Sequence, residues 1–215
     1  MLKDLLIETW RGKSLARILM NIALGERVVS LKGRILDIGG GGNPSYLRYM
    51  DVSDATVDSV NIEAPRNPTY FHDLNEPFPI ADATYDSALC INVIYCLRDP
   101  DLMTREAFRI LRSGGNYVLV SPYVFNDNPE PEDYVRFTRM GLERLLRQAG
   151  FQDIQIKAIG GRASAAESLL DPIRLFYPIR IACRLWAIFL DRYILKTLDE
   201  QHPAPQAFLV TAVKK

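Results

Sequence analysis

The chain has 215 residues, of which 48% are apolar and 24% charged, and its 26 basic residues balance 26 acidic ones. This length suits one α/β domain, so a single domain is expected over residues 1–215. Balanced charge excludes an overall basic field, and no nucleic-acid partner is expected. No uncharged apolar run reaches the roughly 18 residues of a membrane span, and the charges scattered through residues 1–29 are unlike a signal peptide. We therefore expect a cytoplasmic protein.

Residues 1–31 predict one or two helices that pack against a sheet. From residue 33 onward, short apolar runs alternate with helical patterns, which is typical of a parallel sheet. The expected strands are 33–39, 55–64, 69–74, 85–97, 116–123, 151–160 and 206–215. A helix is expected to end at Gly114 and Gly115, and another is expected to be capped by Thr138 and to end at Gly150. The pattern predicts a doubly wound, mostly parallel, seven-stranded sheet.

Residues 162–206 are expected to form an insertion of one or two helices before the last strand. At 100° per residue, Arg180, Arg184 and Asp191 fall on one side of a helix, and Trp186 and Phe189 fall on the other. The first interpretation is a lid that packs its apolar face on the domain. The alternatives are a homodimer face and a contact of residues 174–194 with a membrane or a lipid-linked acceptor.

The stretch "RILDIGGGGNPSY", residues 34–46, places four glycines after a strand. Such a turn brings backbone N–H groups close to a ligand. The nicotinamide fingerprint G-x-G-x-x-G fits poorly, because its third glycine falls on Pro44 or Ser45. An acid does stand two residues before the first glycine, at Asp37. It would repel a pyrophosphate but suits a ligand with a cationic amino-acid end.

On these residues the chain resembles class I S-adenosylmethionine-dependent methyltransferases. "ILDIGGGGNP" is similar to the first motif of that family, and "EPFPIADATYD" and "RILRSGG" are similar to parts of its middle block. The resemblance covers roughly residues 32–160 in the family's order. It implies a Rossmann-like methyltransferase fold, a methyltransferase activity and S-adenosyl-L-methionine as the cofactor.

The resemblance also implies a cofactor site at the carboxyl ends of the parallel strands, where open α/β sheets bind ligands. Glu63 would bind the ribose hydroxyls, Asp73 would lie by the adenine, and Leu74 would present its backbone to that base. Asn92 would face the methyl group, or it would equally pair with backbone in the core. The expected cofactor-binding residues are Asp37, Gly39, Gly40, Gly41, Glu63, Asp73, Leu74 and Asn92.

The acceptor side is less defined. Many relatives carry an acid-His pair after the fourth strand, where this chain has Tyr95 and Cys96. No catalytic base is identified. The loop "SPYVFNDNPEPEDYVRFT" is expected to cover the methyl donor, with Tyr123, Tyr134 and Arg136 as candidate substrate residues. The alternative is that this segment only braces the next helix.

The leading function is a methyltransferase acting on a small-molecule or glycan acceptor. One alternative is a non-catalytic partner subunit with the same fold, and a weaker one is a nicotinamide-dependent oxidoreductase. The three cysteines, Cys90, Cys96 and Cys183, lack metal-ligand spacing, so buried reduced thiols and no metal site are expected.

Overall fold

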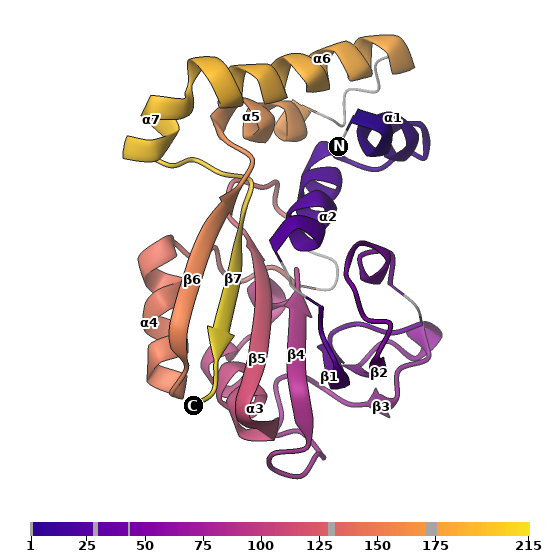
Figure 1. Cartoon of the computed structure of the whole chain (residues 1–215), viewed down its shortest axis with the longest axis vertical. Helices are drawn as coiled ribbons and strands as arrows, with labels where there is room; N and C mark the ends of the chain where they lie inside the picture. The colour runs from indigo at the N-terminus through magenta and orange to yellow at the C-terminus, as the bar shows by residue number, and fades with distance from the viewer. Residues whose placement is uncertain (1, 28–29, 43, 129–131, 171–175) are drawn as a thin grey trace.

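The computed structural model describes residues 2–27, 30–42, 44–128, 132–170 and 176–215. A seven-stranded sheet in the order β3-β2-β1-β4-β5-β7-β6 forms its centre (Figure 1). The strands are β1 (Gly33–Ile38), β2 (Ala55–Asn61), β3 (Tyr70–Phe71), β4 (Tyr85–Ile91), β5 (Leu111–Pro122), β6 (Gln152–Ile159) and β7 (Ala207–Val213). Strand β7 runs antiparallel to β5 and β6, and the pairs among β1 to β5 are parallel. The predicted fold class is confirmed.

Both faces of the sheet are covered, and β4 shows why its second half, residues 88–91, is apolar throughout. Ala88 and Cys90 point into the core under α3 (Pro100–Ile110) and α4 (Arg139–Ala149). Leu89 and Ile91 point into the opposite core, which α2 (Leu15–Arg27) covers. A strand buried on both sides needs apolar residues at every position.

The helix stops were predicted with mixed success. Thr138 caps α4, because its side chain accepts a hydrogen bond from the Gly141 N–H at 3.1 Å, and Gly150 ends that helix at φ 105°. The predicted stop at Gly114 and Gly115 is wrong. Helix α3 ends at Ile110, and both glycines lie inside β5, where the pairing with β4 shifts register.

Five further helical segments lie at the end of the molecule to which the parallel strands point (Figure 1). They are α1 (Leu2–Trp10), α5 (Arg162–Leu170), α6 (Tyr177–Phe189), a π-helical turn (Leu190–Ile194) and α7 (Lys196–Gln201). The N-terminal helices are thus two, α1 and α2, and α2 lies against the sheet. No helix in the described ranges is long and apolar enough to cross a membrane.

The interpretation of the insertion as a lid with its apolar face inward is wrong. Helix α6 turns its polar side toward the domain: the Arg184 side chain is 0% exposed. The apolar side faces outward, with Trp186 60% exposed. Cys183 is exposed on the same helix and Cys96 is half-buried, so of the three thiols predicted to be buried only Cys90 is fully so. The polar side turned inward because α1 and α5 supply buried partners for it.

Candidate active site

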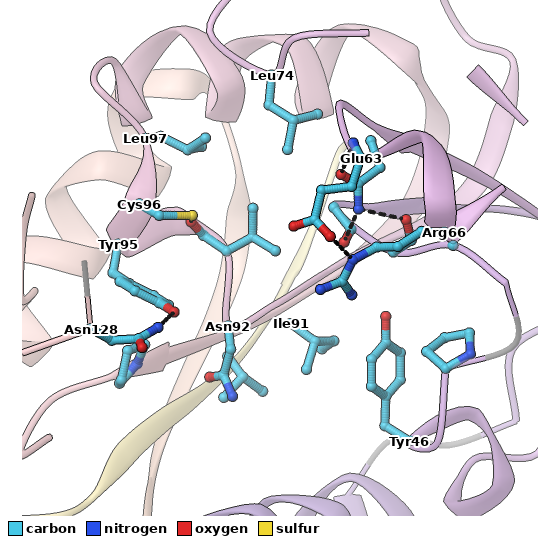
Figure 2. Close-up of a pocket in the computed structure, with 18 of the residues that line it drawn as sticks. Tyr46, Glu63, Arg66, Leu74, Ile91, Asn92, Tyr95, Cys96, Leu97 and Asn128 are labelled. Atoms are coloured by element: carbon cyan, nitrogen blue, oxygen red, sulfur yellow. Dashed lines mark hydrogen bonds and ion pairs between the residues drawn. The ribbon is translucent and has the colours of Figure 1, made fainter. Parts of the chain in front are cut away.

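A cavity of about 800 Å³ opens at the carboxyl ends of the parallel strands. This volume lies within the range of roughly 300–1,000 Å³ that small-molecule sites occupy. One end is bounded by the glycine loop and by the tips of β2 and β3. The other end is bounded by the segment after β4 and by the loop after β5 (Figure 2). Helix α2 and the residues before it supply a further wall with Ser14, Ala16, Arg17 and Met20.

The glycine loop is packed so closely that side chains would collide with the protein itself. A Cβ on Gly39 would overlap Val93, and one on Gly40 would overlap the Asp37 carboxylate. At Gly41 a Cβ would lie 2.7 Å from the Arg66 carbonyl oxygen, and the φ of +154° is also unfavourable for other residues. The absence of side chains therefore lets the loop fit between β1, β4 and the β2 tip while it lines the cavity.

Asp37 lies beneath this loop and not on the cavity surface. Its carboxylate is 1% exposed, and the Tyr46 hydroxyl lies 2.5 and 2.7 Å from its two oxygens. Burial raises the pKa of Asp37 to about 7, and the hydrogen bond from Tyr46 partly opposes this. The direct contact of Asp37 with a ligand ammonium remains a prediction. Such a contact requires the Asp37 carboxylate to approach the cavity past Gly40, which lies against it.

Asn61, at the end of β2, fixes the loop and was not singled out from the sequence. Its Nδ2 donates to the carbonyl oxygens of Gly39 and Gly40 at 2.7 and 2.9 Å. Its Oδ1 accepts from the Glu63 N–H at 2.9 Å. One buried amide thus joins the glycine loop to the acid that follows β2. In the sequence, the one sign of this role is that Asn61 stands two residues before Glu63.

Glu63 lines the cavity as predicted, but its carboxylate has a partner. Arg66 Nε lies 2.5 Å from Glu63 Oε2, and the Arg66 side chain also lines the cavity (Figure 2). The two side chains are about half exposed, so the pair is a weak one by itself. Its geometry holds the carboxylate at the rim, where ligand hydroxyls can replace or share the arginine.

Asp73 and Leu74 line the neighbouring wall, where the sequence placed them. The Asn75 backbone N–H bonds Asp73 Oδ1 at 2.9 Å, and this bond holds the pKa of Asp73 below its ordinary value. Asn75 Oδ1 accepts from the Arg98 N–H at 2.8 Å. Buried Leu74 adds an apolar surface beside these polar groups. This combination suits a flat heteroaromatic base with a polar edge.

Asn92 stands at the end of β4, between the two ends of the cavity (Figure 2). Its φ is 55°, a left-handed conformation that is uncommon outside glycine but tolerated by asparagine. Its Nδ2 lies 3.3 Å from the Met20 sulfur, and its buried Oδ1 has no hydrogen-bond partner within the described part of the chain. A buried carbonyl oxygen without a partner fits a site whose ligand completes it.

At the far end of the cavity lies Tyr95, at the position after the fourth strand where many relatives carry the acid of an acid-His pair. Its hydroxyl accepts a hydrogen bond from Asn128 Nδ2 at 3.2 Å, so its own O–H hydrogen remains available to a bound molecule. Burial raises the pKa of Tyr95, which keeps the phenol neutral near pH 7. The Arg136 guanidinium lies 5.2 Å from the centre of the Tyr95 ring and pairs with Asp133, Nη2 to Oδ2, at 2.5 Å.

The three candidate substrate residues lie outside the cavity lining. Arg136 supports Tyr95 from behind, and Tyr123 packs against Phe208 with ring centres 5.3 Å apart. Tyr134 is half exposed, and its hydroxyl bonds Glu132. The loop after β5 instead lines the cavity with Phe125, Asn128 and Glu132. Glu130, also in this loop, lies outside the described residues. The sequence pattern alone could not show which side chains of an irregular loop turn inward.

Comparison with known proteins is consistent with this geometry. Residues 36–119 match the family model described as a methyltransferase domain. The chain is 28% identical over 162 residues to the O-methyltransferase rstn1 of Aspergillus nomiae, covering 63% of this chain and 72% of that protein. It is 26% identical over 155 residues to 2-methyl-6-phytyl-1,4-hydroquinone methyltransferase 2 of Oryza sativa, covering 61% of this chain and 42% of that protein. The match to the rice enzyme therefore spans less than half its length.

Solved structures share the fold at low sequence identity. A SAM-dependent methyltransferase from Archaeoglobus fulgidus matches with a TM-score of 0.60 at 15% identity, covering 92% of this chain and 94% of that one. Phosphoethanolamine N-methyltransferase 2 of Haemonchus contortus, in complex with S-adenosyl-L-methionine, matches with a TM-score of 0.59 at 16% identity. That match covers 91% of this chain and 52% of that one.

Proposed function

We propose that this chain, which is a class I S-adenosylmethionine-dependent methyltransferase, methylates a hydroxyl group on a small acceptor with an apolar, ring-containing body. The observation that carries the proposal is the continuity of the cavity. It runs from the glycine loop and Glu63 to Tyr95, Phe125 and Asn128 without an intervening wall of the chain. Donor and acceptor can therefore lie in one continuous cavity.

The cofactor end has the groups that the donor needs. S-adenosylmethionine supplies an already activated methyl group on a sulfonium. The chain's residues would hold the molecule around it: Glu63 would bind the hydroxyls, Asp73 and Leu74 would lie by the base, and the glycine loop would leave room for the amino-acid end. The unpartnered Asn92 Oδ1 lies midway, and its partial negative charge favours a positively charged group there.

The acceptor end favours a neutral molecule with a hydroxyl. The Tyr95 O–H can donate to an oxygen of the acceptor, because Asn128 already occupies the phenol oxygen as a donor. Phe125 offers a ring surface, and Glu132 is placed to receive the hydroxyl proton while Tyr134 orients its carboxylate. The names of two relatives support a hydroxyl-bearing aromatic acceptor, since one is an O-methyltransferase and the other a hydroquinone methyltransferase.

Catalysis then consists mainly of positioning and exclusion of water. Tyr95 and Asn128 would position the acceptor oxygen, and Glu132 would accept the proton that this oxygen loses when it is methylated. Glycans are disfavoured relative to aromatic acceptors, because Phe125, Tyr95 and Leu97 make much of this end apolar or aromatic.

The test is transfer of labelled methyl groups from S-adenosylmethionine to a panel of phenols, hydroquinones and glycosides. Phenols and hydroquinones are expected to be methylated, with glycosides inactive. Tyr95→Phe should raise KM for the acceptor, and Glu132→Gln should lower kcat by about 10²–10⁴. A chain that binds S-adenosylhomocysteine but methylates no acceptor would favour the partner-subunit alternative. A chain that binds a nicotinamide cofactor instead would overturn the proposal.

A further inference from the structure

Large apolar side chains are exposed to solvent on α1 and on the outward side of α6 and the residue before it. On α6 and the residue before it these are Phe176, Ile179, Leu185, Trp186 and Phe189. On α1 they are Leu2, Leu6, Ile7 and Trp10. We call these nine residues the outer surface. A contiguous apolar surface of this kind marks an interaction site in a folded protein.

The two helices form one continuous surface. The Trp10 and Tyr177 rings meet edge to face with centres 5.1 Å apart, and the Tyr177 hydroxyl donates to the Leu6 carbonyl oxygen at 3.0 Å. Further along α6, Trp186 and Phe189 stack with centres 5.4 Å apart. Figure 1 shows α6 lying across the end of the molecule with α1 next to it. The surface therefore belongs to the end that also holds the cavity.

The orientation of α6 is fixed by its polar side, so the apolar side cannot simply roll inward. The buried Arg184 bonds Glu167 Oε1 at 3.1 Å, Thr9 Oγ1 at 2.7 Å and the Lys13 carbonyl oxygen at 3.0 Å. Asp191 accepts from the N–H groups of Gly161 and Ala163 at the start of α5, at 2.9 and 2.7 Å. Breaking these bonds would leave buried charges without partners.

The charges around the outer surface have one sign. Within the described residues 2–14 and 176–199, the exposed charged side chains are Lys3, Arg11, Arg192 and Lys196. The carboxylates in these ranges are buried or half-buried, and buried Glu8 pairs with Arg11 at 2.6 Å. Glu200, 3.9 Å from Lys196, is the first exposed carboxylate beyond them. A second copy of the chain would bring the same cations against these cations. A negatively charged layer would complement them.

We propose that the outer surface binds the interface of an anionic lipid bilayer. Apolar and aromatic side chains would enter the boundary between head groups and acyl chains, where tryptophan and tyrosine are favoured, and the four cations would meet lipid phosphates. The α1–α2 hairpin that carries Trp10 also supplies Ser14 and Arg17 to the cavity wall, so a bound bilayer would lie near the substrate site. The proposal does not depend on the identity of the acceptor.

The chain contains two tryptophans, and both lie on the outer surface, with Trp10 75% and Trp186 60% exposed. Their intrinsic fluorescence therefore reports on this surface and on no other. Vesicles of phosphatidylcholine and phosphatidylglycerol in equal parts should shift the emission to the blue and carry the protein down on sedimentation. Pure phosphatidylcholine vesicles should do so much less, and added salt should weaken the binding.

The decisive variant is Trp186→Asp, and the matched control is Met140→Asp, which adds the same charge at an exposed apolar residue on α4. Trp186→Asp should lower the bound fraction on the order of tenfold, and the control should bind as the wild type does. Equal binding by Trp186→Asp, or no binding by the wild type, would overturn the proposal. Concentration-dependent dimerisation that Trp186→Asp abolishes, in a chain that ignores vesicles, would assign the surface to a second copy instead.

Discussion

The amide of Asn61 gives the sharpest test of how the cofactor site is held. In Asn61→Asp the side chain keeps its shape, and one oxygen still accepts from the Glu63 N–H. The other group changes from a donor into a carboxylate oxygen that faces the Gly39 and Gly40 carbonyls, now 2.7 and 2.9 Å from Nδ2. The substitution thus removes two hydrogen bonds and replaces attraction by repulsion.

The magnitude follows from these contacts. Two lost hydrogen bonds at about 0.5–1.5 kcal/mol each amount to about 1–3 kcal/mol, before any cost of burying the new charge. The loop holds Gly39, Gly41 and Gly42 at φ of 78°, 154° and 53°, and without Asn61 the ligand must order it on binding. We expect the Kd of S-adenosylhomocysteine to rise about 10- to 100-fold, which corresponds to about 1.4–2.8 kcal/mol.

The assay is isothermal titration of the folded variant with S-adenosylhomocysteine, with stability followed by urea unfolding. Asn116→Asp is the matched control, because Asn116 is exposed on β5 next to Ser87, toward the amino ends of the parallel strands. The control should bind with the wild-type Kd. A folded Asn61→Asp protein that also binds with the wild-type Kd would refute the view that this amide organises the site.

Two further predictions concern buried charge. Burial raises the pKa of Asp37 from its ordinary 3.8 to about 7, so the native chain holds the Asp37 proton more tightly than the unfolded chain does. The stability that this proton contributes is fully present below pH 4 and is lost as pH rises through 7. Asp37→Asn should therefore gain stability relative to wild type between pH 5 and pH 8 in urea unfolding, and an unchanged difference would contradict the raised pKa. Arg184→Met removes the cation facing Glu167 and Thr9, and should lower the free energy of unfolding by about 3–5 kcal/mol. Adding Glu167→Gln should recover part of that loss, and a single variant as stable as wild type would show that Arg184 does not hold α6 in place.

Much of the fold follows from local patterns. Apolar runs marked all seven strands, and the acids Glu63 and Asp73 were placed at the cavity because each closely follows such a run. The glycine loop was recognisable because positive φ and close packing leave few other residues there. The stop at Gly114 and Gly115 was wrong because the same glycines also suit a strand that shifts register against its neighbour.

The parts of the site that depend on irregular backbone could be seen only in three dimensions. Asn61 is an ordinary strand residue in the sequence, and its role appears only when β2 and the glycine loop come within hydrogen-bonding distance. In the loop after β5, Phe125 lines the cavity while Tyr123 packs against Phe208. Without a regular period, no spacing rule tells which of these rings turns inward.

The sequence by itself determined that the insertion, residues 162–206, contains a helical pattern with one polar and one apolar side, because periodicity is a local property of the chain. Which side faces the domain was decided by Thr9 and Lys13, which are more than 170 positions from Arg184 in the chain and contact it only after folding. A buried cation with fixed partners outweighs the general tendency of apolar side chains to turn inward. The tertiary structure therefore placed the apolar side outward.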